Sequence, residues 1–121
     1  MTQEQKDLLL KDLCGRLPYD VKISVNDNVE SLQGINILDN VVEYGSWLSS
    51  DVEEVNPYLF PLSSMTDEQK EEHKDLLDNQ YSFDADGNIF TLQDFYCKYH
   101  LDFRGLIDKG NAIDATGLNI Y

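Results

Sequence analysis

The sequence predicts an α+β fold, in which an N-terminal helix precedes a small antiparallel sheet and two to three further helices pack on that sheet. Three observations favour this class. Residues 2–17 carry leucines at helical spacing, residues 21–55 alternate apolar with polar positions between turn signals, and residues 67–103 return to helical spacing. Strands of this number and length would form a strongly curled sheet or an open barrel of SH3-like type.

Length and composition are those of one folded domain. The chain has 121 residues, of which 41% are hydrophobic and 11% aromatic, so it can bury a modest core. Within a single domain 1–121 we expect a helix plus β-meander in 1–56, a proline-aromatic connector in 57–66, and a helical part in 67–121 with a short hairpin near 81–90.

The first helix has clear local signals. Thr2 and Gln5 form the pattern of a capping box, Gly15 is a natural C′ residue, and Pro18 blocks continuation. Its apolar face repeats every three or four residues and must pack on something: Leu9, Leu10, Leu13, Cys14 and Leu17.

The strands of the meander are expected at 21–25, 29–38, 41–48 and 52–55, with a bulge or bend at Gly34. In the connector, Pro57 and Pro61 favour extended geometry. The residues between and around them are apolar, so we expect the connector to lie across the core; a proline-aromatic recognition strip is the alternative.

The last third begins with a mostly solvated helix capped by Thr66 and a hairpin at Asp86-Gly87. A helix capped by Thr91 follows and is expected to reach Asp102, with a short helix after it that stops at Gly110. Its apolar stripe consists of Leu92, Phe95, Tyr96, Tyr99 and Phe103. The apolar tail beyond residue 112 is expected to be held by packing.

Charge limits the function classes. The net charge is −14, from 23 acids and 9 bases, and no Lys or Arg occurs from Ile23 to Gln69. Direct binding to nucleic acid or to an anionic membrane is therefore disfavoured. A basic protein partner fits the charge, although solvated acids on turns and helices would give the same pattern.

No catalytic, cofactor or metal site is predicted. The segment from Ser82 to Ile89 is similar to a calcium-binding loop but lacks the first carboxylate and the closing Glu. Cys97 and His100 form only half of a zinc site, and no nucleophile or phosphate-loop motif occurs. Two cysteines, Cys14 and Cys97, indicate free thiols in a reducing compartment. The absence of a signal peptide or an apolar span favours a cytoplasmic location.

Interaction candidates come from the acidic middle and from isolated aromatic or basic residues. Arg104 is expected to fix the last turns by a salt bridge or carbonyl contact, with a partner's carboxylate as the alternative. Trp47 is expected to pack in the core or at a sheet edge, with a surface contact as the alternative. The full set of candidates is Asp39, Glu43, Trp47, Asp51, Glu53, Glu54, Tyr58 and Arg104.

The stretches PYLFPLSSMTDEQK (Pro57–Lys70) and HLDFRGLIDKGNAIDATGLNIY (His100–Tyr121) resemble a family of short uncharacterised proteins from gut bacteria and their phages. This chain has GNAID where the family pattern would have GLAID. The resemblance implies a phage- or mobile-element-linked intracellular protein and carries over no activity. We therefore expect a non-enzymatic protein-protein interaction or accessory protein. The alternative is an acidic inhibitor that mimics nucleic acid and occupies a basic host protein.

Overall fold

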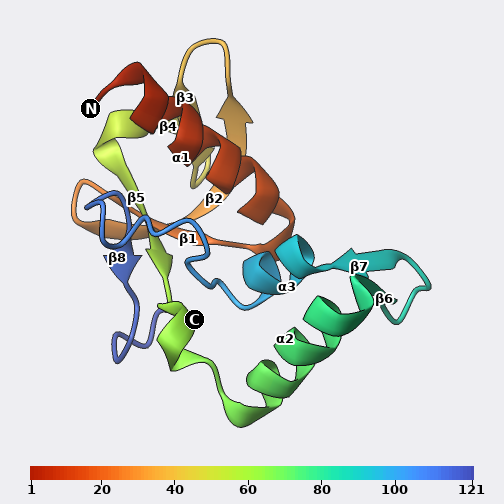
Figure 1. Cartoon of the computed structure of the whole chain (residues 1–121). Coiled ribbons are helices and arrows are strands. Elements are labelled where there is room, and N and C mark those ends of the chain that lie inside the picture. The colour runs from red at the N-terminus through yellow and green to blue at the C-terminus, as the bar shows by residue number, and fades with distance from the viewer.

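A computed structural model describes all 121 residues and has a mixed α+β fold (Figure 1). Helix α1 (Gln3–Arg16) lies beside a six-stranded sheet with the order β4-β3-β2-β1-β5-β8. The strands are β1 (Lys22–Val25), β2 (Asn28–Asn36), β3 (Val41–Tyr44), β4 (Leu48–Asp51), β5 (Val55–Leu59) and β8 (Ile113–Asp114). Neighbours pair antiparallel except β5 and β8, which are parallel.

Helix α1 starts as predicted, because Thr2 and Gln5 form the capping box. Its end was predicted incorrectly: Gly15 lies inside the helix, which runs to Arg16 and passes into a 3₁₀ turn, Leu17–Tyr19. A Cβ at Gly15 would lie 3.3 Å from Gln93 Nε2 and 3.7 Å from Cys97 Sγ. The missing side chain therefore lets a later helix pack closely here.

Strand β2 bends the sheet. Its first residues pair with β1 and its last residues pair with β3, with a register shift between Leu32 and Gly34. The bulge expected at Gly34 is confirmed, and a bulge increases the local twist. The strand order runs linearly from edge β4 to edge β8, so no closed barrel is formed and the SH3-like arrangement stays a prediction.

The connector crosses the core as expected, and it does so as a strand. The predicted strand at 52–55 is instead a 3₁₀ turn, Val52–Glu54, followed by β5. Pro57 lies opposite Ile23 in the β1–β5 pair, and Tyr58 and Leu59 are buried. A proline cannot donate to the ladder, which is one reason that this stretch does not have the sequence pattern of a strand.

Most of the core lies between α1 and the sheet. It contains fourteen buried residues, among them the three helix leucines Leu9, Leu10 and Leu13 and strand residues such as Ile23 and Val42. Burial of this apolar stripe stabilises a helix that alone would be marginal in water.

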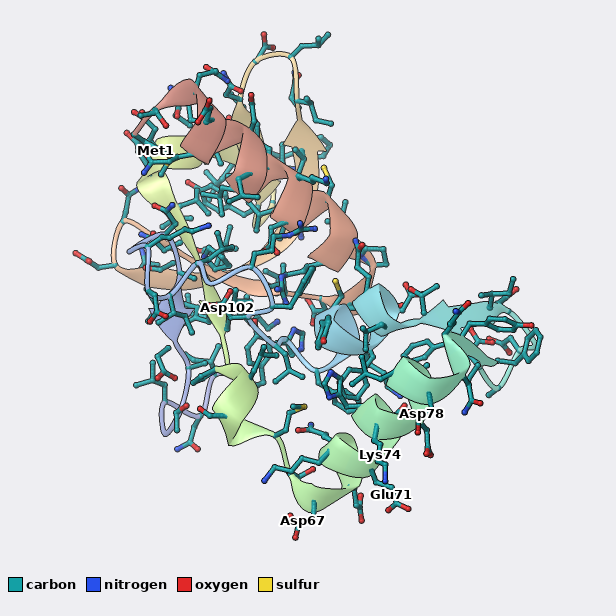
Figure 2. The ribbon with its side chains drawn as sticks, viewed as in Figure 1. Met1, Asp67, Glu71, Lys74, Asp78 and Asp102 are labelled. Atoms are coloured by element: carbon teal, nitrogen blue, oxygen red, sulfur yellow. The ribbon has the colours of Figure 1, made fainter.

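A second, smaller core is formed by the later elements. Helix α2 (Asp67–Asn79), hairpin β6 (Tyr81–Phe83) and β7 (Ile89–Thr91), and helix α3 (Leu92–Lys98) surround Leu76, Phe90, Phe95 and Leu101. Helix α2 is capped by Thr66 and buries only Leu76, so it is as solvated as predicted. Figure 2 shows Asp67, Glu71, Lys74 and Asp78 on the face of α2 that points away from the rest of the protein.

Helix α3 is shorter than predicted. It ends at Lys98, His100 has a φ of 56°, and no helix follows before Gly110. The backbone of Phe60 accounts for this end, because it forms hydrogen bonds with His100 and Asp102 around a bridge to Leu101. Phe103 still joins the aromatic stripe by stacking on Tyr96, with 4.9 Å between ring centroids.

The tail is held by packing, as expected. Strand β8 pairs with β5, and the Tyr121 hydroxyl links the backbones of β1 and β5. It accepts a hydrogen bond from the Lys22 amide at 3.0 Å and donates one to the Tyr58 carbonyl at 2.6 Å. The Tyr121 ring stacks on His100 with 3.7 Å between centroids.

Candidate interaction surfaces

Arg104 forms an internal ion pair. Its Nε donates to Asp12 Oδ1 at 3.0 Å, while Arg16 Nε donates to the other carboxylate oxygen at 2.7 Å. Arg16 Nη2 also donates to the Leu101 carbonyl at 2.7 Å, and both guanidinium groups lie over the Phe103 ring. The expected structural role of Arg104 is confirmed, although its partner is Asp12 of α1 and not a neighbouring aspartate.

Tyr58 is also internal. It is only 8% exposed, and the hydroxyl of Tyr121 covers its carbonyl. Its side chain therefore has little surface to offer a partner. Although 43% of Tyr121 is exposed, its hydroxyl is enclosed by these hydrogen bonds, and burial raises the pKa of that hydroxyl.

Four of the five candidate acids are dispersed: Asp39, Asp51, Glu53 and Glu54. Asp39 lies in the β2–β3 turn, where it accepts a hydrogen bond from Asn36 at 2.9 Å. Asp51 caps the following 3₁₀ turn through the Glu53 amide, and Glu53 pairs with Lys6 of α1 at 3.3 Å. Of these four, only Glu54 is exposed with no ion pair or side-chain hydrogen bond.

The side chains of Cys97 and His100, considered above as half of a zinc site, have pKa values that disfavour nucleophilic or acid–base chemistry at neutral pH. Burial raises the pKa of the Cys97 thiol, which disfavours the nucleophilic thiolate. Burial and the nearby Arg16 charge lower the pKa of His100 to about 4, and its Nδ1 has no hydrogen-bond partner in the chain. In the hairpin turn, Asp84 accepts hydrogen bonds from the amides of Asp86 and Asn88, both at 2.9 Å. The fold gathers no group of three or more His, Cys, Asp or Glu side chains able to hold a metal ion.

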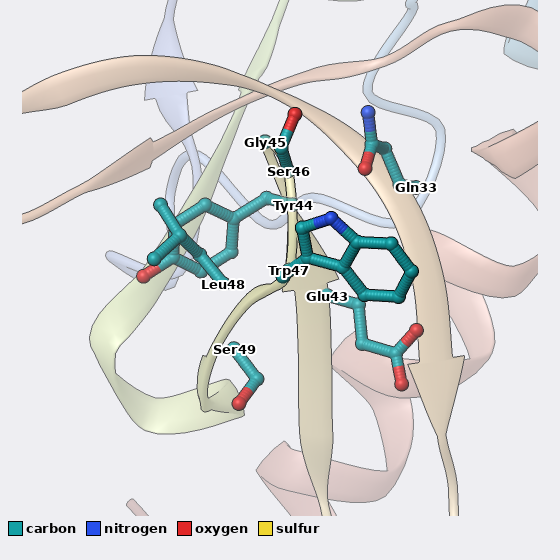
Figure 3. Close-up of a pocket in the computed structure, with 8 residues that line it drawn as sticks. All are labelled: Gln33, Glu43, Tyr44, Gly45, Ser46, Trp47, Leu48 and Ser49. Atoms are coloured by element: carbon teal, nitrogen blue, oxygen red, sulfur yellow. The ribbon is translucent and has the colours of Figure 1, made fainter.

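Two of the predicted residues, Glu43 and Trp47, come together at an open hollow of about 630 Å³ on the outer face of β2, β3 and β4 (Figure 3). Trp47 was expected to be packed, but it is fully exposed, at 101% of its reference area. It lies in the β3–β4 turn with a φ of 74°, and this turn carries the indole away from the core. The lining residues are Gln33, Glu43, Tyr44, Gly45, Ser46, Trp47, Leu48 and Ser49.

A second surface was missed by the sequence reasoning. Tyr81, Phe83 and Ile89 share one face of the β6–β7 hairpin, because Phe83 lies opposite Ile89 and Tyr81 is two residues from Phe83. They are 51%, 64% and 64% exposed, and the Tyr81 and Phe83 rings meet edge to face at 5.7 Å. We call these three residues the ribbon face. Alternation predicted the hairpin, but no sequence signal indicated which side would be buried.

The other face of the same hairpin explains this exposure. Phe90, opposite Ser82, is 9% exposed and packs into the second core with Leu76 and Phe95. A two-stranded hairpin can cover only one of its faces in this way. The ribbon face is therefore left to water within the single chain.

None of the helices combines the length and apolar character needed to cross a membrane.

Comparisons with known proteins do not assign the chain to any group. No family model matches the chain, no curated protein is significantly similar to it, and no solved structure significantly matches its fold.

Proposed function

We propose that this protein is a non-enzymatic intracellular interaction module that binds another protein through the ribbon face. The observation that carries the proposal is the clustering of Tyr81, Phe83 and Ile89, each more than half exposed, on one side of a projecting hairpin (Figure 1). Contiguous apolar surface on a folded protein is typical of interaction sites, and aromatic side chains dominate binding energy at such sites.

The charges near the ribbon face indicate the chemistry of the partner. The hairpin turn carries Asp84 and Asp86, both exposed, and the whole chain has a net charge of −14. Two copies meeting at this face would bring like charges together, which is unfavourable. A different protein, with an apolar groove bordered by Lys or Arg, fits better than a second copy.

The chemistry of the interior supports a non-enzymatic role. Cys97 is buried with a raised pKa, and His100 has a lowered pKa and faces Tyr121. The hollow on β2, β3 and β4 is open and contains no nucleophile paired with a base. These features favour binding over catalysis.

The test compares the wild type with Phe83→Ser and with Val29→Ser as a matched control. Val29 is 48% exposed on β2, so both variants remove an exposed apolar side chain, but only one of them alters the ribbon face. Each tagged protein is used to capture partners from the organism that encodes it. A protein that the wild type captures is then purified, and its binding to the wild type and to both variants is measured directly by calorimetry.

We expect Phe83→Ser to weaken this direct binding by about tenfold or more, and Val29→Ser to leave it unchanged. Equal binding by the two variants would refute the ribbon face as the site. If the affinity is unchanged by Phe83→Ser but falls steeply as the salt concentration rises, the result would favour the acidic nucleic-acid mimic. Concentration-dependent dimerisation that Phe83→Ser abolishes would replace the foreign partner with a second copy.

A further inference from the structure

We propose that the hollow on β2, β3 and β4 is a binding site for an arginine side chain of a partner protein, held between the Trp47 indole and the Glu43 carboxylate. This inference goes beyond the ribbon face. It concerns a different surface on other elements, so either proposal can fail while the other stands.

Trp47 forms one side of the site. Its indole contacts almost nothing in the chain, so a ring face is free, and Figure 3 shows it beside Gln33 and Glu43. Tryptophan is usually among the well-buried residues, and the left-handed φ of 74° is a conformation that non-glycine residues rarely adopt. Neither the exposure nor the backbone conformation is explained by packing within this chain.

Glu43 supplies the charge. Its position on β3 is opposite Gly34 of β2, and a Cβ at Gly34 would lie 2.6 Å from Glu43 Oε2. The glycine therefore leaves room for the carboxylate to lie over β2, inside the hollow. None of the five ion pairs in the structure involves Glu43, so this charge is unneutralised within the chain.

The lining of the hollow favours a cation. Beside Trp47 its lining includes the polar residues Glu43, Gln33, Ser46 and Ser49, together with the apolar Tyr44 and Leu48. Glu30 Oε2 lies 3.5 Å from the Cβ position of Gly45 at the turn, which adds a second negative charge near the rim. An apolar ligand would strip these groups of water without replacing their hydrogen bonds, whereas a cation satisfies the acceptors and is attracted to the ring face.

Among cationic side chains, arginine matches this set best. Its planar guanidinium can stack on an indole while its edge donates two hydrogen bonds to one carboxylate. Its remaining N–H groups are donors for other polar lining residues, such as Gln33. Lysine is a compact point charge with three donors, and it cannot stack and form a bidentate pair in this way.

The test uses the only Trp of the chain as its own reporter, because its indole N–H gives one resolved NMR signal. N-acetyl-arginine amide is titrated into labelled protein beside N-acetyl-lysine amide and N-acetyl-citrulline amide, the last being an uncharged analogue of arginine. Glu43→Gln is compared with Glu54→Gln, which removes an equal charge from an exposed acid outside the hollow. Trp47→Leu is followed through the side-chain amide of Gln33.

We expect the arginine compound to shift the indole signal saturably, with the lysine compound binding more weakly and the citrulline compound hardly at all. Glu43→Gln should weaken arginine binding about threefold or more, Trp47→Leu should weaken it similarly, and Glu54→Gln should leave it unchanged. Equal binding of arginine and citrulline would overturn the cation site, and so would equal effects of the two Glu→Gln variants. Equal binding of arginine and lysine would overturn the choice of arginine.

Discussion

Replacing Asp12 with alanine should destabilise this protein more than replacing any other acidic residue. Asp12 is fully buried in its side chain and is the only carboxylate paired with Arg16 and Arg104. Arg16 is equally buried, and its Nη1 has no hydrogen-bond partner in the chain. Without Asp12, Arg16 would keep its charge in the interior with only the Leu101 carbonyl as a strong acceptor.

The expected loss is about 3–5 kcal/mol in the free energy of unfolding, the usual cost of leaving one member of a buried ion pair alone. Arg104 adds less, because its side chain is 15% exposed and can turn toward water. Asp12→Ala removes only a small carboxylate group, so the cavity that it leaves contributes only a minor part of the loss in stability. For a chain of this length each kcal/mol lowers Tm by about 4 °C, so the loss corresponds to about 12–20 °C.

The assay is urea unfolding followed by circular dichroism, with Tm from a thermal scan. Asp7→Ala is the matched control, because Asp7 lies on the exposed side of the same helix and accepts only a hydrogen bond from Gln3. It should change stability by no more than about 0.5 kcal/mol. The double variant Asp12→Ala/Arg16→Met removes the stranded charge and should recover part of the loss.

Two results would refute this reasoning. A loss below about 1 kcal/mol in Asp12→Ala would mean that water or local movement relieves the Arg16 charge. A double variant less stable than Asp12→Ala would mean that the arginine contributes by packing on Phe103 and not through its ion pair.

Three further changes test other parts of the structure. His100 has a pKa of about 4, lowered from 6.5, so the folded state binds fewer protons and its stability falls as pH drops from 6.5 towards 4. Between pH 7 and pH 5 this group should lower the free energy of unfolding by about 1 kcal/mol, since its partial exposure to water reduces the full effect of the shift. His100→Asn, which tolerates the positive φ, should unfold in urea with a smaller pH dependence, and an unchanged dependence would contradict the assignment. Tyr121→Phe should lower the free energy of unfolding by about 1–2 kcal/mol, because it leaves the Lys22 amide and the Tyr58 carbonyl without their shared partner, whereas Tyr81→Phe on the exposed ribbon should have no effect. If Tyr121→Phe and Tyr81→Phe have the same free energy of unfolding, the hydrogen bonds of the Tyr121 hydroxyl do not stabilise the fold. Trp47→Gly should be about 1 kcal/mol more stable than Trp47→Ala, since both remove the indole but only glycine adopts a φ of 74° without strain; the reverse order in thermal unfolding would show that the turn relaxes.

Much of the secondary structure could be predicted because its causes lie within a few residues. The capping boxes at Thr2, Thr66 and Thr91 all form as the sequence patterns indicate. The hairpin around Asp86-Gly87 and the bulge at Gly34 are also local, since each depends on turn geometry or on one residue without a side chain.

The candidate site could be predicted only in part. Glu43 and Trp47 were both chosen from the sequence, but their meeting on one face depends on the β2–β3–β4 register and on the direction of the tight turn. The ribbon face could not be found in advance, because alternation specifies two faces without saying which is covered. The covered face is the one that carries Phe90, because Phe90 packs against Leu76 and Phe95.

By itself, the sequence determined where helices begin, where hairpins turn and that the chain is strongly acidic, because these follow from short-range hydrogen bonding and composition. Contacts between distant segments determined the rest. Phe60 ends α3 by pairing with the backbone around Leu101, the tail enters the sheet beside β5, and Arg104 reaches Asp12 across 92 residues of sequence. Such contacts form only when the fold has brought both segments together, so they cannot be predicted from the local sequence of either segment.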